Sequence, residues 1–222
     1  MTIKANQIVR SSRKTLALIV KPDGSLIVRA PLRTSGKSVR EFIEKNRQWI
    51  EKNQAKALAS LPPTPKQYLP GEMFMFLGNM YALEIVKRQE KDLLLDHSFK
   101  LAEAARSNAA LTFEQWFRGQ ARQILSERVQ VYACQHDFQY ERIGITSART
   151  RWGSCRARGA LNFSWRLILA PLEVVDYVVV HELVHIIFHN HSKRFWHKVG
   201  MVMPNYKEHR IWLRKNAQQL LI

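Results

Sequence analysis

Alternating apolar positions predict a strand-rich first part of the chain. Residues 6–30 contain two such runs around a Pro-Asp-Gly-Ser sequence at 22–25, which predicts two strands of a β-hairpin. The alternating residues are Leu16, Leu18 and Val20 before the turn and Leu26 and Val28 after it. A helix is then predicted from Ser38 to about Ala57, because Ser38 and Glu41 match a capping box. Its apolar stripe, Val39, Phe42, Ile43, Trp49 and Ile50, is typical of a packing face.

A proline-rich segment separates these elements from further short strands. Four prolines between Leu61 and Gly71 predict a stiff connector. Short apolar runs at 74–76 and 81–86 flank a Gly-Asn turn signal, and 93–95 predicts another strand. These elements indicate a β-rich platform in which we recognise no catalytic constellation.

The second part of the chain has mainly helical periodicity. A long helix is predicted from Thr112 to about His136, again with a capping box. Two antiparallel strands are predicted at 143–148 and 161–169, joined by a basic loop. On the second strand, one face is predicted to lie in the core and the other, with Asn162, Ser164 and Arg166, to face solvent. The core face consists of Leu161, Phe163, Trp165 and Leu167.

Neither Gly nor Pro interrupts residues 172–189, whose apolar content predicts a buried helix. This helix carries His181, Glu182 and His185 in the order H-E-x-x-H. The two histidines are one turn apart, so both imidazoles can reach one metal ion with Glu182 beside them. A core helix with incidental histidines is the alternative, but a buried carboxylate and two imidazoles need a partner, and a metal satisfies all three.

A catalytic zinc site needs a third protein ligand and one open position. His189 would lie a further turn along a continuing helix, about 12 Å in axial rise from His181, which is too far for one ion. His191 follows Asn190, a residue that tolerates the left-handed conformation ending many helices, so a turn there favours His191. His197 is expected on the next helix, which Ser192 caps and which ends near Pro204. Cys155 is a weaker alternative ligand, since three histidines complete the set.

Five longer motifs surround these candidate ligands. They are R-W-G-S-C at 151–155, L-N-F-S-W-R-L-I-L-A-P at 161–171, D-Y-V-V-V-H-E-L-V-H at 176–185, N-H-S-K-R-F-W at 190–196 and P-N-Y-K-E-H-R-I-W-L at 204–213. These motifs resemble those of the YgjP-like zinc metallopeptidases, which are similar to the SprT and WLM groups of zincin-type proteases. The resemblance is strongest over Arg149 to Trp212 and looser upstream of about Leu111. One departure is that Phe188 is followed by His189, where family members often carry a histidine one place earlier.

The resemblance implies an α+β, zincin-like fold with an antiparallel sheet packed on long helices. It implies that His181, His185 and His191 are ligands of one Zn²⁺ per chain and that Glu182 is the catalytic carboxylate. It also assigns the strand pair before the metal helix to binding an extended substrate. We expect an N-terminal β-rich subdomain at 1–105 and a metallopeptidase domain at 106–222.

The predicted function is zinc-dependent hydrolysis of peptide bonds in a protein or peptide substrate, with Glu182 as general base. Tyr206 and His209, on a predicted last helix, are candidate oxyanion donors, although both are equally typical of surface residues. A non-proteolytic zinc hydrolase and a binding domain with a vestigial site are alternatives. Intact ligands together with Glu182 argue against the vestigial site.

The charge of the chain adds a further alternative. The net charge is +17, shared almost equally between residues 1–110 and 111–222, which favours anionic partners. A nucleic-acid-associated protease or binding module, acting on DNA- or RNA-bound proteins, is therefore the second functional hypothesis. Two cysteines, Cys134 and Cys155, and no apolar run of transmembrane or signal-peptide type predict a soluble cytoplasmic protein.

Overall fold

A computed structural model describes residues 3–21, 23–59 and 65–221, and the chain divides into two compact units, Met1–Pro62 and Pro63–Ile222. This division differs from the boundary expected after residue 105. Strand residues such as Phe74 and Phe99 share one core with Phe113 of the following long helix, so the strands between them belong to the second unit. Part of the predicted proline connector, residues 60–64, lies outside the described residues.

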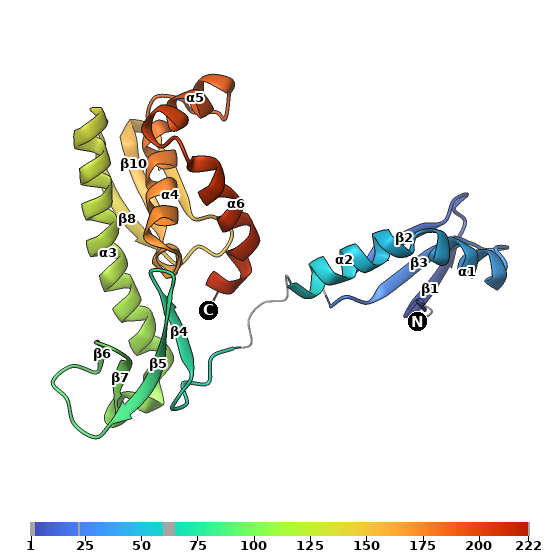
Figure 1. The fold of residues 1–222 in the computed structure, drawn as a ribbon, viewed down its shortest axis with the longest axis horizontal. Coiled ribbons are helices and arrows are strands. Elements are labelled where there is room, and N and C mark those ends of the chain that lie inside the picture. Colours follow the sequence, from blue (N-terminus) through green and yellow to red (C-terminus); the bar gives the residue numbers. More distant parts are fainter. Residues whose placement is uncertain (1–2, 22, 60–64, 222) are drawn as a thin grey trace. The chain divides into compact units, whose positions relative to one another are not determined.

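The first unit is a three-stranded sheet with two helices (Figure 1). Strands β2 (Ala17–Val20) and β3 (Leu26–Pro31) form the predicted antiparallel pair, and an additional strand β1 (Gln7–Ser11) pairs with β3 in parallel. Its core residues are Leu26, Val28, Ala30, Val39, Ile43 and Ile50.

The single helix predicted at 38–57 is two helices, α1 (Gly36–Lys45) and α2 (Arg47–Ala59). The expected capping box was wrong: Ser35 is the N-cap, and its hydroxyl accepts a hydrogen bond from the Ser38 N–H at 3.1 Å. The helix breaks at Asn46, whose amide donates to the Phe42 carbonyl at 2.8 Å and satisfies an acceptor of the last turn. Trp49, predicted to pack, is 46% exposed.

The second unit begins with a four-stranded sheet in the order β4-β5-β7-β6. Strands β4 (Met73–Phe76), β5 (Asn79–Val86) and β6 (Leu93–Leu95) confirm the predicted ones, and β7 (Phe99–Ala102) was not predicted. A short 3₁₀ segment, Glu103–Asn108, leads into α3 (Ala109–His136). This helix begins three residues before Thr112, whose hydroxyl donates to the Asn108 carbonyl instead of capping.

A second sheet has the order β8-β10-β9 and differs from the predicted antiparallel pair. Strands β8 (Arg142–Thr146) and β10 (Ala160–Ser164) are parallel, because the loop between them contains a third strand, β9 (Gly153–Arg156), which reverses the chain and pairs antiparallel with β10. A short turn, η2 (Ala157–Gly159), connects β9 to β10. Strand β9 therefore lies at one edge of the sheet.

The predicted solvent face of 161–169 was also wrong. The strand ends at Ser164, and Trp165–Leu169 form a 3₁₀ helix, η3, in which the alternation no longer applies. Ser164 is 1% exposed and Arg166 is 7% exposed. The loop before β9 supplies hydrogen-bond acceptors for both buried side chains: Ser164 Oγ donates to the Ala148 carbonyl at 2.7 Å, and Arg166 Nη1 donates to the Ser147 carbonyl at 3.1 Å.

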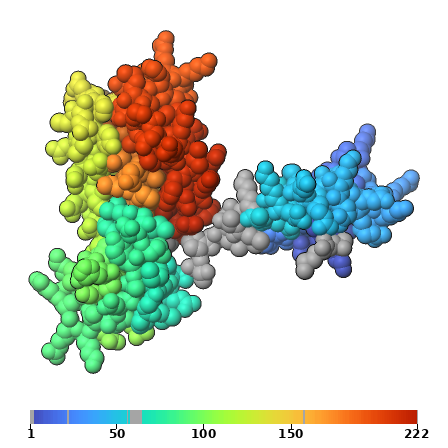
Figure 2. Space-filling view, in the orientation of Figure 1, coloured from blue at the N-terminus to red at the C-terminus, as the bar shows by residue number. Residues whose placement is uncertain are grey.

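Three helices complete the second unit: α4 (Leu172–Val184), α5 (Lys193–Val202) and α6 (Tyr206–Asn216), followed by a 3₁₀ segment, η4 (Ala217–Leu220). Helix α4 packs against α3, α5 and α6, and little of its orange surface is visible between yellow α3 and the red C-terminal helices (Figure 2). Among the described residues, no helix combines the length and apolar character needed to cross a membrane.

Candidate metal centre

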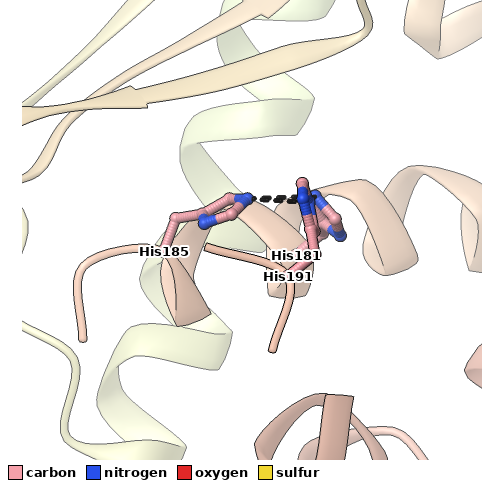
Figure 3. Close-up of side chains that lie close together, drawn as sticks. All are labelled: His181, His185 and His191. Carbon is pink, nitrogen blue, oxygen red and sulfur yellow. Dashed lines mark hydrogen bonds between the residues drawn. The ribbon is translucent and has the colours of Figure 1, made fainter. Parts of the chain in front are cut away.

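Three histidine rings converge at the C-terminal end of α4 (Figure 3). The Nε2 atom of His185 lies 3.2 Å from that of His181 and 3.2 Å from that of His191, and the remaining Nε2 pair is 3.0 Å apart. The three nitrogens thus form a nearly equilateral triangle. Within the described part of the chain, these histidines form a group of ligand atoms that could hold a metal ion.

The three rings converge because α4, the helix that leads into His185, ends earlier than predicted. The sequence predicted a helix to His189, but α4 ends at Val184, with His185 as its C-cap residue. The Ile186 and Ile187 N–H groups donate to carbonyls only three residues back, each at 3.1 Å, so the chain tightens into a turn directly after the helix. Ser192 then caps α5 as predicted, accepting from the Phe195 N–H at 3.4 Å. Residues 186–191 are thereby held between two helix ends, and His191 returns to the other two rings.

Burial favours the neutral form of His181 and His185, and a hydrogen bond fixes the tautomer of His185. Nδ1 of His185 lies 2.9 Å from the Phe188 carbonyl oxygen, which can only accept, so Nδ1 carries the proton and Nε2 presents its lone pair. Burial is the main reason that the pKa of His181 is lowered to about 3, with a further contribution from the other two imidazoles. Burial also lowers the pKa of His185. Neutral imidazoles are the form that binds a metal.

Aromatic side chains support the three rings. Phe195 is fully buried, and its ring centroid lies 4.9, 4.5 and 4.9 Å from those of His181, His185 and His191 respectively. Trp196 stacks on His191 at 5.6 Å with an interplanar angle of 23°. The sequence did not predict this role for Phe195 and Trp196, because the turn that places α5 beside the three rings leaves no signal in the periodicity.

The remaining candidate ligands lie outside the cluster. His189 is exposed, although it lines the same cavity, and His197 lies on α5 as predicted and is exposed. Cys155 also lines the cavity but does not belong to the ligand group. Burial, followed by the charge of Glu182, raises the pKa of the Cys155 thiol. The geometry thus brings together the histidine set favoured from the sequence.

Glu182 is buried beside the cluster, with 5% of its surface exposed. Its carboxylate accepts a hydrogen bond from the Cys155 backbone N–H, which together with Arg151 lowers its pKa, but burial dominates and raises the pKa to about 7. Gly153 lies against the same carboxylate: a β-carbon there would be 2.5 Å from Glu182 Oε1. The R-W-G-S-C motif therefore contributes a glycine without which Glu182 could not occupy this position.

The histidines and Glu182 open onto a cavity of about 340 Å³. Its other lining residues include Gly153, Ser154 and Cys155 of β9, so an edge strand runs along the cavity. Tyr206 and His209, the oxyanion candidates, are not among the lining residues; Tyr206 instead stacks on Trp196 at 5.5 Å. Tyr177 lies closer to the three histidines, with its ring 6.0 Å from that of His181, and burial raises its pKa to about 12.

The donor set fits zinc. Nitrogen ligands at 2.0–2.1 Å in tetrahedral geometry lie about 3.3 Å from one another, close to the 3.0–3.2 Å between the three Nε2 atoms. Three imidazoles leave one tetrahedral position open, as in catalytic rather than structural zinc sites. The chemistry of the residues therefore suits a catalytic metal.

Comparison with protein families supports the same conclusion. The family model described as YgjP-like, metallopeptidase domain matches residues 14–216 of this 222-residue chain. The match confirms the resemblance seen in the sequence motifs and includes α4 and the turn to His191. No curated protein matches the chain.

Proposed function

Because the chain belongs to the YgjP-like metallopeptidase family and is a peptidase, we propose that it hydrolyses peptide bonds with one zinc ion held by His181, His185 and His191. Glu182 is the proposed general base. The observation that carries this proposal is the convergence of three imidazole Nε2 atoms beside a buried carboxylate in one cavity. A structural zinc would use four protein ligands and need no free carboxylate.

When bound, zinc supplies Lewis acidity, which lowers the pKa of a water molecule and polarises the substrate carbonyl. Glu182 accepts the proton of that water and later returns it to the amine nitrogen of the departing product. The Cys155 N–H holds one side of the Glu182 carboxylate, and Gly153 leaves room for it. Phe195, beneath the three imidazoles, keeps water from that side of the ligands.

We further propose that an extended substrate adds to the free edge of β9. The Trp152 carbonyl accepts from the Ser164 N–H at 2.9 Å, so Trp152 directs its carbonyl toward β10. Backbone groups alternate in direction along a strand, so Gly153 and Cys155 direct theirs toward the cavity. Their carbonyls are available to a peptide that pairs with the edge. This proposal moves the substrate strand predicted for the pair 143–148 and 161–169 to β9.

Metal analysis and peptide cleavage together test this function. The purified wild type is expected to bind about one zinc per chain, which His191→Ala loses and His189→Ala retains. Glu182→Gln is expected to keep zinc but lose peptide cleavage by at least about 1,000-fold, since it removes the general base. Equal zinc loss in both histidine variants would refute the ligand assignment, and full activity of Glu182→Gln would refute the general base.

Association with nucleic acid is a second candidate function, favoured by the charge of the first unit. Residues 1–62 carry 13 Lys or Arg and four Asp or Glu, a net charge of +9 in little more than a quarter of the chain. Cation-rich surfaces bind polyanions with an affinity that falls steeply with salt. Binding of a fluorescent single-stranded RNA or DNA between 50 and 300 mM salt, with and without neutralisation of Lys45 and Lys52, tests it. Absence of binding at 50 mM salt would exclude it.

The state of the two cysteines indicates the redox conditions of the cellular compartment. Cys134 and Cys155 are both free thiols, as expected in a reducing environment. We therefore propose that the peptidase acts in the cytoplasm.

A further inference from the structure

A second cavity, of about 230 Å³, adjoins the metal cavity toward the N-terminal end of α4. The two cavities share Gly153, His181 and Glu182 in their linings. The remaining residues of the second cavity come from three places in the chain: Trp152 directly precedes β9, Tyr177 and Val178 lie one turn before His181 on α4, and Leu213 lies on α6.

The walls of this second cavity are mainly apolar beyond the end that it shares with the metal cavity. Val178, Tyr177 and Leu213 are 4%, 5% and 8% exposed, so the walls belong to the packed core. His181 and Glu182 also line the cavity, and both lie at the end shared with the metal cavity; its other lining residues carry no charge. Away from Glu182, a charged group would lose its hydration without gaining a charged partner, whereas an apolar group would gain contacts.

The direction of β9 relates this cavity to the cleaved bond. Along the chain from Trp152 to Cys155, the adjoining space passes from the second cavity to the metal cavity. A peptide paired antiparallel with β9 runs the opposite way, so the residue after the cleaved bond lies on the Trp152 side. Glu182, which lines both cavities, would deliver its proton to the amine nitrogen of that same residue.

We propose that the second cavity binds the side chain of the substrate residue that follows the cleaved bond and selects medium-sized apolar side chains. Leu213 and Val178 set the depth of this specificity site. The proposal rests on the proposed zinc-peptidase function and adds a substrate preference to it.

Leu213 offers a test with two opposite size changes. The zinc-loaded full chain is assayed with peptides that differ only in the residue after the cleaved bond: Ala, Leu, Phe, Asp or Lys. The wild type is expected to prefer Leu over Asp and Lys by about 50-fold in kcat/KM. Leu213→Ala deepens the cavity and should raise the Phe-to-Leu ratio about tenfold, whereas Leu213→Phe should lower the Leu-to-Ala ratio about tenfold. Ratios within one variant are unaffected by a change in the folded fraction.

Ile211→Ala provides the matched control, because Ile211 lies on the same helix but is 43% exposed and does not line the cavity. It should keep wild-type ratios. Unchanged ratios in both Leu213 variants would overturn the proposal while leaving the peptidase function intact.

If the zinc-loaded protein cleaves none of the peptides, that result counts against the proposed peptidase function. A binding measurement then tests the specificity site separately. Peptide-mimetic hydroxamates carrying an isobutyl or a methyl group at the position after the scissile carbonyl are compared by calorimetry. The isobutyl compound should bind about tenfold more tightly, and Leu213→Phe should remove this difference. Equal affinities for the wild type would overturn the proposed specificity site.

Discussion

Gly153 and Glu182 are in such close contact that the strand tolerates no side chain at this point. A β-carbon on Gly153 would lie 2.5 Å from Oε1, 2.6 Å from Cγ and 2.8 Å from Cδ of Glu182. The contact joins the edge strand proposed to bind substrate to the proposed general base. Because Gly153 is a strand residue without a positive φ, this steric relationship rather than backbone conformation explains the glycine.

Gly153→Ala is expected to displace the Glu182 carboxylate. Since a misplacement of about 1 Å can cost 100-fold in rate, kcat/KM for peptide cleavage should fall by about that factor or more. Zinc content should stay at the wild-type value, because the methyl group meets Glu182 and not an imidazole. Gly119→Ala is the control: nothing lies within 4 Å of its added β-carbon, and activity should be unchanged. Equal activity of Gly153→Ala and wild type would contradict the assigned role of Glu182.

The metal-free protein should become less stable relative to Glu182→Gln as the pH rises. Burial raises the folded-state pKa of Glu182 from 4.5 to about 7, so the folded state binds this proton more tightly than the unfolded state does. The resulting stabilisation is fully present below pH 4.5 and is lost as the pH rises through 7. Glutamine cannot ionise and avoids this loss, which is at most about 3 kcal/mol.

Urea unfolding at pH 5 and pH 8, with a chelator present, measures the difference between wild type and Glu182→Gln. The difference should shift in favour of the glutamine variant by about 2–3 kcal/mol between these pH values. Zinc should reduce the shift, because a nearby cation favours the carboxylate. A difference that is the same at both pH values would show that Glu182 ionises normally.

Helices α3 and α4 are joined by a largely buried ion pair whose loss should destabilise the second unit. Asp176, 7% exposed, accepts hydrogen bonds from Arg128 Nε at 2.6 Å and Nη2 at 2.8 Å, and from the Tyr132 hydroxyl at 3.2 Å. Asp176→Asn leaves the Arg128 cation without its charged partner. We expect a loss of about 2–3 kcal/mol, below the range for fully buried pairs because Arg128 is partly exposed.

Tryptophan fluorescence during urea unfolding measures this loss, since five of the six tryptophans lie in the second unit. Glu103→Gln is the control, because the pair between Glu103 and Arg106 is exposed and 3.9 Å apart. Its removal should change the free energy of unfolding by less than about 1 kcal/mol. A similar small effect of Asp176→Asn would mean that the α3–α4 contact is held by apolar packing alone.

The convergence of the three histidines beside Glu182 could be predicted from the sequence, because it depends on short spacings. The H-E-x-x-H order fixes which side chains share a helical face, and Asn190 with Ser192 indicated where the chain turns and restarts. In the structure this turn begins earlier than predicted, because α4 ends at Val184 rather than at His189. Apolar residues continue through 186–188 without a break in periodicity, so the sequence pattern contained no signal for the end of the helix.

The order of the strands was harder to predict from the sequence, because it depends on contacts between residues far apart in the chain. Nothing in residues 153–156 has the alternation of a strand, yet β9 pairs with β10 along Gly153–Phe163 and Cys155–Leu161. Because β9 was missed, the predicted direction of β8 relative to β10 was wrong. Because the 3₁₀ helix after Ser164 was missed as well, the prediction placed Ser164 and Arg166 in solvent. Similarly, the assignment of 73–102 to an N-terminal subdomain relied on secondary-structure type, whereas the packing of Phe74 and Phe99 on α3 determines the compact unit.

The N-cap of α5 should link folding of the 186–191 turn to metal affinity. Ser192 directly follows His191, and its hydroxyl accepts from the Phe195 N–H. Ser192→Ala removes this acceptor and should cost about 1 kcal/mol of stability. The variant should also fray the first turn of α5 and loosen His191 and Phe195. Zinc affinity, measured by competition with a chelating dye, should therefore fall about fivefold to tenfold.

Ser35→Ala is the control for this prediction. It removes the equivalent cap of α1 in the first unit, so it should lower stability similarly while leaving zinc affinity unchanged. Equal zinc affinity in the two variants would show that the position of His191 is set by its ring contacts with Phe195 and Trp196 rather than by the helix cap.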